Sequence, residues 1–399
     1  KNDASKACAE RIRLPRFMGL LMPSTPIPKY PRMAPGTLHA PSPQGKVIRA
    51  LGAAMCRRRT ETAGAVRFPR APQVSSSPIG FNAAMPFDAP GVPDANPVLV
   101  EVTRGGAVES RHRGAFAVVD TEGRVLLSAG AVETPVFPRS TIKPIQALAL
   151  LESGAADAFG LSEAELALAC ASHNGEPDHV ATVTAWLDRL GLGAGDLECG
   201  GHAPKHAPSA EALAAAGQAA DARHDNCSGK HTGFLTLARQ LGAPTHGYID
   251  FAHPVQQRVL GVLEQMTGLD DLTAQPRGID GCGIPTIALP LGNLALALAR
   301  FAEPDDQPER RQHACRRLQQ AVANQPRMIA GTHRVDTAIA QELGTRCLAK
   351  AGAEGVHGAV LPELGLGVAL KIDDGAGRAA EVALMRLLRR LRVLDDSPE

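Results

Sequence analysis

Strand-like alternation of hydrophobic and polar positions stands at both ends of the patterned part of the chain. The strands are predicted over residues 98–103, 115–120, 124–129, 358–362 and 367–371. Turns containing glycine separate them, as at Arg104-Gly-Gly106 and at Thr121-Glu-Gly123. The first three strands therefore predict an antiparallel meander that opens the domain.

Between and after these strands, hydrophobic positions recur with the period of amphipathic helices. The helices are predicted over residues 145–152, 162–169, 177–191, 209–220, 230–241, 254–267, 291–302 and 307–323, in the stretch after Thr332, and over 379–394. Ser162 and Glu165 stand three residues apart, which predicts a capping box. Strands at both ends with a helical middle predict an α/β (α+β) sandwich, in which N-terminal and C-terminal strands build one mixed sheet.

Composition narrows the class of protein. The chain has 399 residues, of which 44% are hydrophobic and 21% charged, so a sizeable core is expected. No apolar run reaches the ~18 residues that a membrane span needs. Aromatic residues make up only 3%, which argues against a stacking platform for nucleic acid. We expect a cytoplasmic protein with no membrane and no nucleic-acid partner.

Charge divides the chain into two parts. Residues 1–84 are proline-rich and carry a net charge of +11, whereas residues 85–399 carry −10. The basic head shows no sustained hydrophobic period, so we predict that it is disordered. It is interpreted as a targeting peptide, as a basic interaction arm, or as upstream sequence outside the native protein. The third interpretation is favoured, with Met85 as the natural start and residues 85–399 as the catalytic domain.

The cysteines are too scattered for a disulfide framework. No secretion signal precedes them, so reduced thiols or a metal site are expected. The eight cysteines stand at positions 8, 56, 170, 199, 227, 282, 315 and 347.

A Ser-x-x-Lys motif is the sharpest sign of chemistry. Ser140 and Lys143 share a face if residues 140–143 are helical, so a neutral lysine amine could accept the serine proton. Pro144 is compatible with a helix only in its first turn, which places Ser140 at a helix N-terminus. Alone, the motif is equally compatible with a helix cap beside a surface lysine.

Four further segments carry polar residues in tight turns. Ser172, in Ala171-Ser-His-Asn-Gly-Glu176, is a candidate proton relay or substrate ligand, or simply part of a turn before a helix. Lys350 precedes a small-residue–glycine pair next to a strand, an arrangement similar to the Lys-Thr-Gly element of penicillin-recognising enzymes. The loops around Cys227 and Cys282 each offer one thiol.

Two interpretations of the thiols remain open. Cys227 and Cys282 could bind zinc together with Lys230, three residues after Cys227, or they could be two buried free cysteines. A rival metal site would combine Cys199, His202 and His206.

In this order, the motifs resemble the L-asparaginase II family of the rhizobial type, over roughly residues 95–393. That family's fold is similar to serine β-lactamases and serine-dependent glutaminases, and its activity is hydrolysis of L-asparagine to L-aspartate and ammonia. The motifs are Arg139-Ser140-x-x-Lys143, Ser172-His-Asn-Gly-Glu176, Cys227-Ser-Gly-Lys-His231, Asp280-Gly-Cys282-Gly-x-Pro285, Lys350-x-Gly-Ala-Glu-Gly355 and Lys371-x-Asp-Asp-Gly375.

The resemblance implies a role for each matching residue. Ser140 would be the nucleophile with Lys143 as its base, and Ser172 with Lys350 a second pair that relays protons. One zinc ion per subunit would be held by Cys227, Lys230 and Cys282 and would tune substrate binding. The charged ends of the asparagine would be fixed by residues among Arg139, His173, Glu176 and Asp280. The resemblance also implies a homodimer.

Three alternatives stay open. A glutaminase differs by one methylene in its substrate, which is worth only ~1–3 kcal/mol of discrimination. A penicillin-recognising enzyme is disfavoured because no Ser-Asp-Asn element is visible. A zinc or thiol protein without catalysis would need the cysteines but neither Ser140 nor Lys143. A protein that interacts through its basic head is the weakest alternative.

Overall fold

The computed structural model describes residues 10–13, as backbone only, and residues 96–395. Most of the segment predicted to be disordered, residues 1–84, therefore lies outside the described residues. Residues 10–13 differ from that prediction, because they form strand β1, which pairs with the edge of β2.

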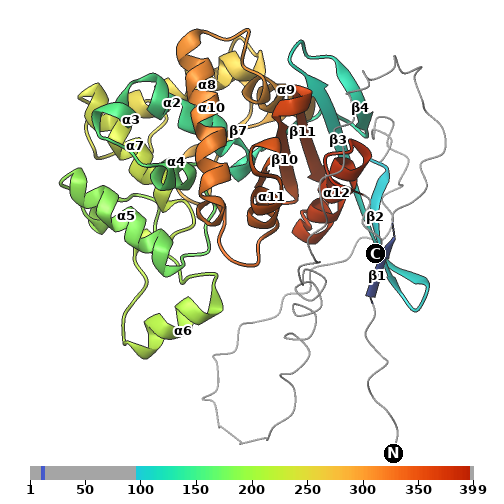
Figure 1. Ribbon diagram of the computed structural model, residues 1–399, viewed down its shortest axis with the longest axis horizontal. Helices are drawn as coiled ribbons and strands as arrows, with labels where there is room; N and C mark the ends of the chain where they lie inside the picture. Colours follow the sequence, from blue (N-terminus) through green and yellow to red (C-terminus); the bar gives the residue numbers. More distant parts are fainter. Residues whose placement is uncertain (1–9, 14–95, 396–399) are drawn as a thin grey trace, which may run out of the picture. The chain divides into compact units, whose positions relative to one another are not determined.

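Both ends of the chain contribute to a single seven-stranded sheet, in the order β1-β2-β3-β11-β10-β9 with β4 beside β3 (Figure 1). The prediction that terminal strands share a sheet is confirmed. Every pair is antiparallel, so the sheet is not mixed as predicted: two hairpin-connected blocks meet antiparallel at β3 and β11. The strands are β1 (Glu10–Arg13), β2 (Val98–Arg104), β3 (Ala107–Asp120), β4 (Val125–Ala129), β9 (Leu348–Ala351), β10 (Val356–Leu361) and β11 (Leu366–Ile372).

Two small two-stranded sheets lie outside this one. The first pairs β5 (Pro135–Val136) with β8 (Leu289–Pro290), and the second pairs β6 (Arg277–Ile279) with β7 (Pro285–Ile287).

The helical middle is confirmed as well. The α-helices are α2 (Lys143–Glu152), α3 (Ala155–Ala158), α4 (Glu163–Ala169), α5 (Pro177–Arg189), α6 (Ala207–Ala215), α7 (Ser228–Leu241), α8 (Pro254–Thr267), α9 (Leu291–Ala302), α10 (Glu309–Asn324), α11 (Val335–Leu343) and α12 (Gly377–Arg390). The 3-10 turns are η1 (Arg139–Ile142), η2 (Ala194–Asp196), η3 (Ala222–His224), η4 (Leu272–Ala274), η5 (Pro326–Ile329), η6 (Gly344–Arg346) and η7 (Pro362–Leu364).

Helices cover both faces of the sheet. Side chains alternate along each strand, so Ala117 and Val119 pack into the core that contains α9, and Val118 packs into the core that contains α12. Helix α12 packs against β10 and β11, on the side of the sheet that faces the viewer in Figure 1. Helix α11 joins the core of α12, and α9 packs against β3 and β11 from the other face. The predicted sandwich is therefore a sheet between two helical layers.

Glycine allows α9 to approach the sheet closely. A Cβ atom at Gly367, on β11, would lie 2.0 Å from the backbone oxygen of Ala295 and 2.3 Å from the nitrogen of Ala299. No side chain fits there, so Gly367 sets the distance between the helix and the strand.

Local signals set two helix starts that matter for the site. Ser162 accepts a hydrogen bond from the backbone of Glu165, whose side chain in turn accepts from the backbone of Ser162, which confirms the capping box of α4. Pro144 stands in the first turn of α2, as expected.

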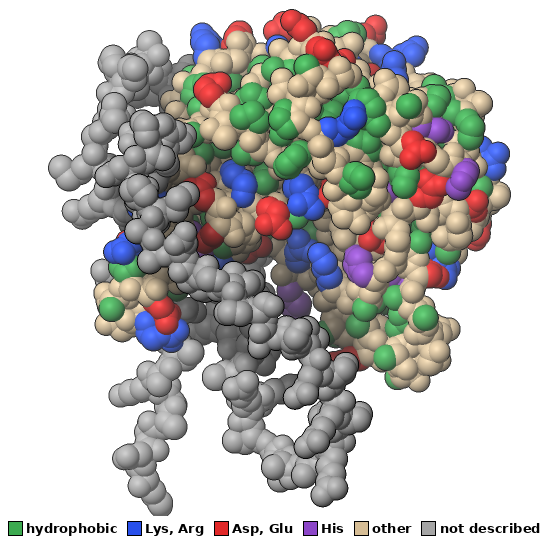
Figure 2. Space-filling model, turned by 180° about the vertical axis from the view of Figure 1, so that it is seen from behind, with side chains coloured by type: hydrophobic (Ala, Val, Ile, Leu, Met, Phe, Trp, Pro, Cys, Tyr) green, Lys and Arg blue, Asp and Glu red, His purple; other side chains and the backbone are tan. Residues whose placement is uncertain are grey.

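The six described cysteines are all free and buried, as expected for reduced thiols; Cys8 and Cys56 lie outside the described residues. No helix in the described part of the chain is long and apolar enough to span a bilayer. Figure 2 shows acidic and basic side chains interspersed on the face seen from behind.

Candidate functional site

Lys143 is buried at the start of α2, where the chain leaves η1. The lysine is only 1% exposed. Its Nζ donates hydrogen bonds to the backbone oxygen of Ala171 at 2.5 Å, to Ser172 Oγ at 3.1 Å and to Cys227 Sγ at 3.1 Å. Lys143 thus connects an oxygen-containing side of the site to a sulfur-containing side.

Ser172 receives a second lysine. It follows α4, and Lys350 projects from β9 so that its Nζ lies 2.9 Å from Ser172 Oγ and 2.6 Å from the backbone oxygen of Ala351. The predicted Ser172–Lys350 pair is present in the structure. One serine oxygen therefore lies between two lysine amines.

Lys350 is suited to accept a proton near neutral pH. Its side chain is 1% exposed, and this burial, with the positive charges of Lys143 and Arg334, lowers the pKa of Lys350 to about 7 despite the opposing attraction of Asp336. Since a general base works best with a pKa near the working pH, Lys350 meets the electrostatic requirement for that role.

Ser140 is placed differently from the expectation. It is half-buried in η1, and among the described residues no hydrogen bond joins its Oγ to Lys143 Nζ, which points to Ala171, Ser172 and Cys227 instead. Side-chain hydrogen bonds in substrate-free sites often form only in the complex. The nucleophilic role of Ser140 stays a prediction.

The turn that carries Ser140 is held on both sides. Arg139 has a φ of +51°, in the left-handed region that non-glycine residues rarely adopt. Its guanidinium binds Asp280 Oδ1 at 2.8 Å, which ties the turn to the loop before Cys282. On the other side, a Cβ at Gly352 would lie 2.7 Å from Thr141 Oγ1, so glycine lets η1 lie against β9.

The sulfur side brings the predicted metal ligands together. Lys230 Nζ donates to Cys282 Sγ at 3.0 Å, and Cys227 hydrogen-bonds to Cys282. The hydrogen bond from Cys282, with the charges of Lys143 and Lys230, holds the pKa of Cys227 well below its usual value. The same hydrogen bond, with burial, raises the pKa of Cys282.

These three residues fit a zinc ion chemically. The lowered pKa of Cys227 favours a thiolate, and a second thiol and an amine lie within hydrogen-bonding distance of one another. Burial alone would lower the pKa of Lys230, but the sulfurs of Cys282 and Cys227 raise it, so this amine must release a proton to bind a metal. The zinc assignment remains a prediction.

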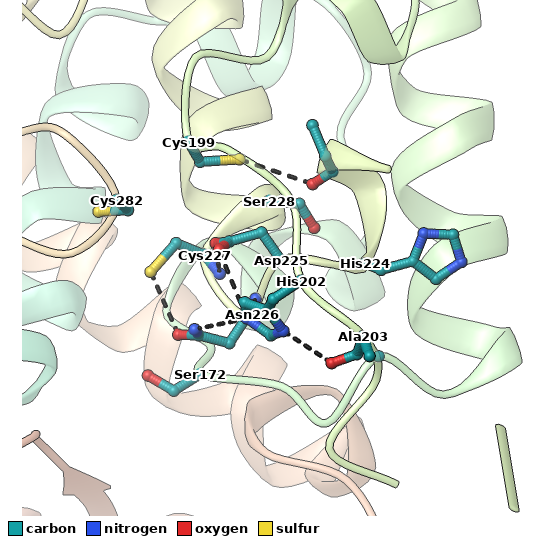
Figure 3. Close-up of polar contacts among 12 residues, drawn as sticks. Ser172, Cys199, His202, Ala203, His224, Asp225, Asn226, Cys227, Ser228 and Cys282 are labelled. Carbon is teal, nitrogen blue, oxygen red and sulfur yellow. Dashed lines mark hydrogen bonds and ion pairs between the residues drawn. The ribbon is translucent and has the colours of Figure 1, made fainter. Parts of the chain in front are cut away.

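The rival metal residues are engaged elsewhere. Figure 3 shows the sulfur of Cys199 directed away from Cys227. This sulfur lies 3.5 Å from the backbone oxygen of Ala222. His202 contacts the backbone oxygen of Ala203, and His206 contacts Ser209. Within residues 96–395, the one group of three His, Cys, Asp or Glu side chains with converging ligand atoms is Glu176, Asp178 and His179.

That group is a helix start with its polar atoms already in use. Glu176 Oε1 accepts from the backbone and hydroxyl of Thr332, and its Oε2 accepts from Arg327. His179 accepts from the backbone of Glu176 and contacts the backbone oxygen of Arg327. These internal bonds explain the group as the N-terminal cap of α5.

Two predicted substrate ligands are buried. His173 is 0% exposed, with one ring nitrogen against Ser228 Oγ and the other accepting from the backbone of Gly175. Glu176 is 1% exposed. Both share the loop of Ser172, so the structure places them in the wall of the site with their polar atoms engaged by the protein.

Sequence reasoning missed several residues near the lysines. Arg334 donates to Asn174 Oδ1 at 3.0 Å and forms no ion pair with a carboxylate in the described residues. Partial burial, with the charges of Arg334 and Lys143, lowers the pKa of Lys205. Asp336 and His357 form a buried pair behind Lys350. Glycine-rich turns identified the other loops, but nothing of that kind marks these four residues.

A small cavity borders the site without containing its lysines. It has a volume of about 30 Å³, enough for about two water molecules. Arg139, Asp280, Gln146 and Gln256 supply its polar lining. Ser140, Ser172, Lys143 and Lys350 are absent from its walls, so this cavity is not the space that the two lysines face.

An antiparallel sheet between helical layers, with a half-buried serine held by two buried lysines, defines a candidate Ser–Lys hydrolytic site. The chain belongs to the L-asparaginase II family, which it matches over residues 100–399. Membership makes it an asparaginase-like amidohydrolase acting on a small-molecule substrate. No curated protein matches its sequence.

Three solved structures have a similar chain path. A structure described as Mglu in its native form has a TM-score of 0.42 and 14% identity, covering 71% of this chain and 66% of that one. A β-lactamase from Mycobacterium bovis has a TM-score of 0.37 and 16% sequence identity, and the match covers 70% of this chain and 95% of that one. A simvastatin synthase mutant from Aspergillus terreus has a TM-score of 0.34 and 13% sequence identity, and the match covers 69% of this chain and 91% of that one. Similarity at this level does not carry over a function.

Proposed function

We propose that this protein hydrolyses L-asparagine to L-aspartate and ammonia through an acyl-enzyme. The observation that carries the proposal is the convergence of Lys143 and Lys350 on Ser172 Oγ, at 3.1 and 2.9 Å, beside the turn that holds Ser140. Two buried amines at one hydroxyl provide a path for a proton, and the family supplies the reaction class.

The chemistry follows from these positions. Ser140 Oγ attacks the side-chain amide carbon, and its proton passes to Lys143 while Lys143 gives one of its own protons through Ser172 to neutral Lys350. Ser172 exchanges protons between Lys143 and Lys350, and a proton returns to the leaving nitrogen as ammonia departs. Water then attacks the ester carbon, which releases aspartate and restores the Ser140 hydroxyl. Lys350 supports this scheme because a pKa of about 7 lets it gain and lose a proton at neutral pH.

An amino-acid amide also needs recognition of its charged ends. Arg334 and Lys205 are cations near Lys143 without a carboxylate partner in the described residues. We assign them to the substrate carboxylate, since a guanidinium and an ammonium bind carboxylates well. Asn174 holds Arg334 in place, and its own amide donates to the backbone oxygen of Thr332.

The proposal includes a zinc ion, for which Cys227, Cys282 and Lys230 would be the ligands. When bound, the ion supplies positive charge beside the substrate. The contact between Lys143 and Cys227 places that charge next to the Ser–Lys residues. All six described cysteines are free, which supports a reducing, cytoplasmic location. The homodimer is testable by light scattering of the purified protein.

The test is ammonia release from L-asparagine and L-glutamine by the full chain, with Ser140→Ala and Ser172→Ala beside it. Turnover of asparagine that both variants abolish is the expected result. Preferred turnover of glutamine would assign the glutaminase activity instead. Release of no ammonia by the folded, zinc-supplied protein would reject the proposal and favour a thiol or metal protein.

A covalent probe distinguishes the two serines. An asparagine analogue with a diazoketone in place of the amide alkylates the nucleophile, and peptide mass spectrometry locates the adduct. We expect the adduct on Ser140 and its absence in Ser140→Ala. An adduct on Ser172 would transfer the nucleophilic role to the serine that both lysines contact.

A further inference from the structure

Behind Lys350 lies a buried carboxylate that the proposed reaction does not use. Asp336 stands in the first turn of α11, and its side chain is 1% exposed. Its Oδ1 lies 2.8 Å from His357 Nε2, and its Oδ2 accepts from the backbone nitrogen of Ala351 at 2.9 Å. Burying a charged group is costly unless the group is paired and hydrogen-bonded, as Asp336 is here.

These bonds reach the residue next to Lys350. Ala351 follows Lys350 in β9, and its backbone oxygen accepts from Lys350 Nζ. His357 is the residue of β10 paired with Ala351. Asp336 therefore fixes the backbone N–H of Ala351. The Lys350 side chain turns back to donate hydrogen bonds to the backbone oxygen of Ala351 and to Ser172 Oγ.

Asp336 is negatively charged in this setting. Burial alone would raise its pKa, but the attraction and hydrogen bond of His357, the charge of Lys350 and the backbone N–H of Ala351 hold its pKa well below the usual range. His357 Nε2 faces the carboxylate, and its Nδ1 has no hydrogen-bond partner in the described residues.

Other charged groups face this pair from every packed element. Lys143 at the start of α2 and Arg334 before α11 oppose a proton on Lys350, and Cys227 before α7 favours it. Cys170, after α4, lies near Lys350 as well. Glu381 on α12 faces Asp336 and His357 from the other side, and burial raises the pKa of that carboxyl group.

We propose that Asp336, oriented by His357, is a positioning residue that holds Lys350 against Ser172 and sets the proton affinity of that lysine. The inference rests on the proposed function for its catalytic meaning, whereas the placement of Lys350 rests on the bonds of Asp336 to Ala351 and His357. Without Asp336, the cations Lys143 and Arg334 would keep Lys350 deprotonated well below neutral pH. A base with so little proton affinity would accept the serine proton poorly.

The experiment measures Lys350 directly. Lysine labelled with carbon-13 at Cε reports the charge of each amine by NMR, and Lys350→Met assigns the signal in the full chain. In Asp336→Asn, which preserves shape but removes the charge, the titration midpoint of Lys350 should fall by about one pH unit or more. In His357→Gln, the matched control that keeps the carboxylate, the midpoint should stay close to that of the wild type.

The activity profile supplies the second readout. The acidic limb of kcat/KM should move to lower pH in Asp336→Asn together with the NMR midpoint, and kcat should fall at least tenfold. Asp336→Ser tests the same point with a smaller side chain if Asp336→Asn does not fold. An unchanged midpoint in either folded variant would overturn the inference and leave Asp336 a purely structural residue.

The two proposals fail in different ways. A shifted midpoint in a protein that releases no ammonia would reject the asparaginase proposal and keep the electrostatic link. Normal turnover of asparagine by the wild type, with an unshifted midpoint in Asp336→Asn, would keep the asparaginase proposal and reject the electrostatic link. Wild type and variants are compared at the same measured zinc content, because the charge of Cys227 favours a proton on Lys350.

Discussion

Lys350 and Lys230 are both buried lysines of one site, yet their surroundings change their pKa values in opposite directions. Lys350 donates to a hydroxyl and a backbone oxygen, and burial lowers its pKa to about 7. Lys230 donates to Cys282, and the sulfurs around it raise its pKa in spite of equal burial.

The contrast shows that burial alone does not decide what a lysine does. Beside neutral oxygen acceptors, desolvation prevails and the amine becomes a base. Beside sulfurs that share negative charge, attraction prevails, and the amine stays a cation until a metal displaces its proton. Lys143 contacts both Ser172 and Cys227 and so joins the two environments.

The strongest test of this contrast is to remove each amine in turn. Lys350→Met should lower kcat by about 1000-fold, since general-base catalysis contributes that order of magnitude. Lys230→Met should lower kcat by less than about tenfold and act mainly on metal content. Steady-state ammonia release measures both. A larger loss in Lys230→Met would reverse the assigned roles.

The pH dependence comes next in size. If neutral Lys350 is the working base, kcat/KM for asparagine should rise about tenfold per pH unit below its pKa of about 7 and level off above it. A profile that is flat from pH 5 to pH 8 would mean that no group with such a pKa limits the reaction.

Metal removal probes the sulfur side. In Cys282→Ser, zinc measured by mass spectrometry of the dissolved protein should fall from one ion per chain to a trace. We expect KM for asparagine to rise by about three- to tenfold, with kcat within about threefold, because the ion tunes binding. Cys199→Ser is the matched control and should keep its zinc, since Cys199 points away from this group.

The smallest effect concerns stability. The folded-state pKa of Lys350 lies below its unfolded value, so folding is penalised fully below pH 7 and the penalty disappears as pH rises through about 10.4. Lys350→Met should therefore raise Tm by about 5 °C at pH 6 and hardly at all at pH 10.5. Lys230→Met should lower Tm, because it leaves Cys227 without one of its cations. Calorimetry at the two pH values measures both.

Local patterns in the sequence were enough to predict most of the helices and strands. Predicted α8 coincides with Pro254–Thr267, and the capping box of Ser162 sets the start of α4. These features depend on neighbours within one or two turns, so short-range spacing suffices. Strand β3 begins at Ala107, eight residues before the prediction, because its first half lies in solvent and lacks the hydrophobic alternation that marks a half-buried strand.

The candidate site divides in the same way. Sequence motifs named Ser172, Lys350, Cys227, Lys230 and Cys282, and the structure brings them within hydrogen-bonding distance in the pairs described above. Resemblance to a family supplied the roles, because a motif specifies which groups are present and not where they meet.

Only the tertiary structure decided the partners of Lys143. Three-residue spacing places Ser140 and Lys143 on one turn, but a lysine side chain has several rotatable bonds and follows the strongest acceptors within its reach. Those acceptors, Ala171, Ser172 and Cys227, arrive from segments 28 to 84 residues away in the chain. Asp336 was not predicted for the same reason. Its burial and the charges of His357 and Lys350 beside it exist only after α11 packs beside β9.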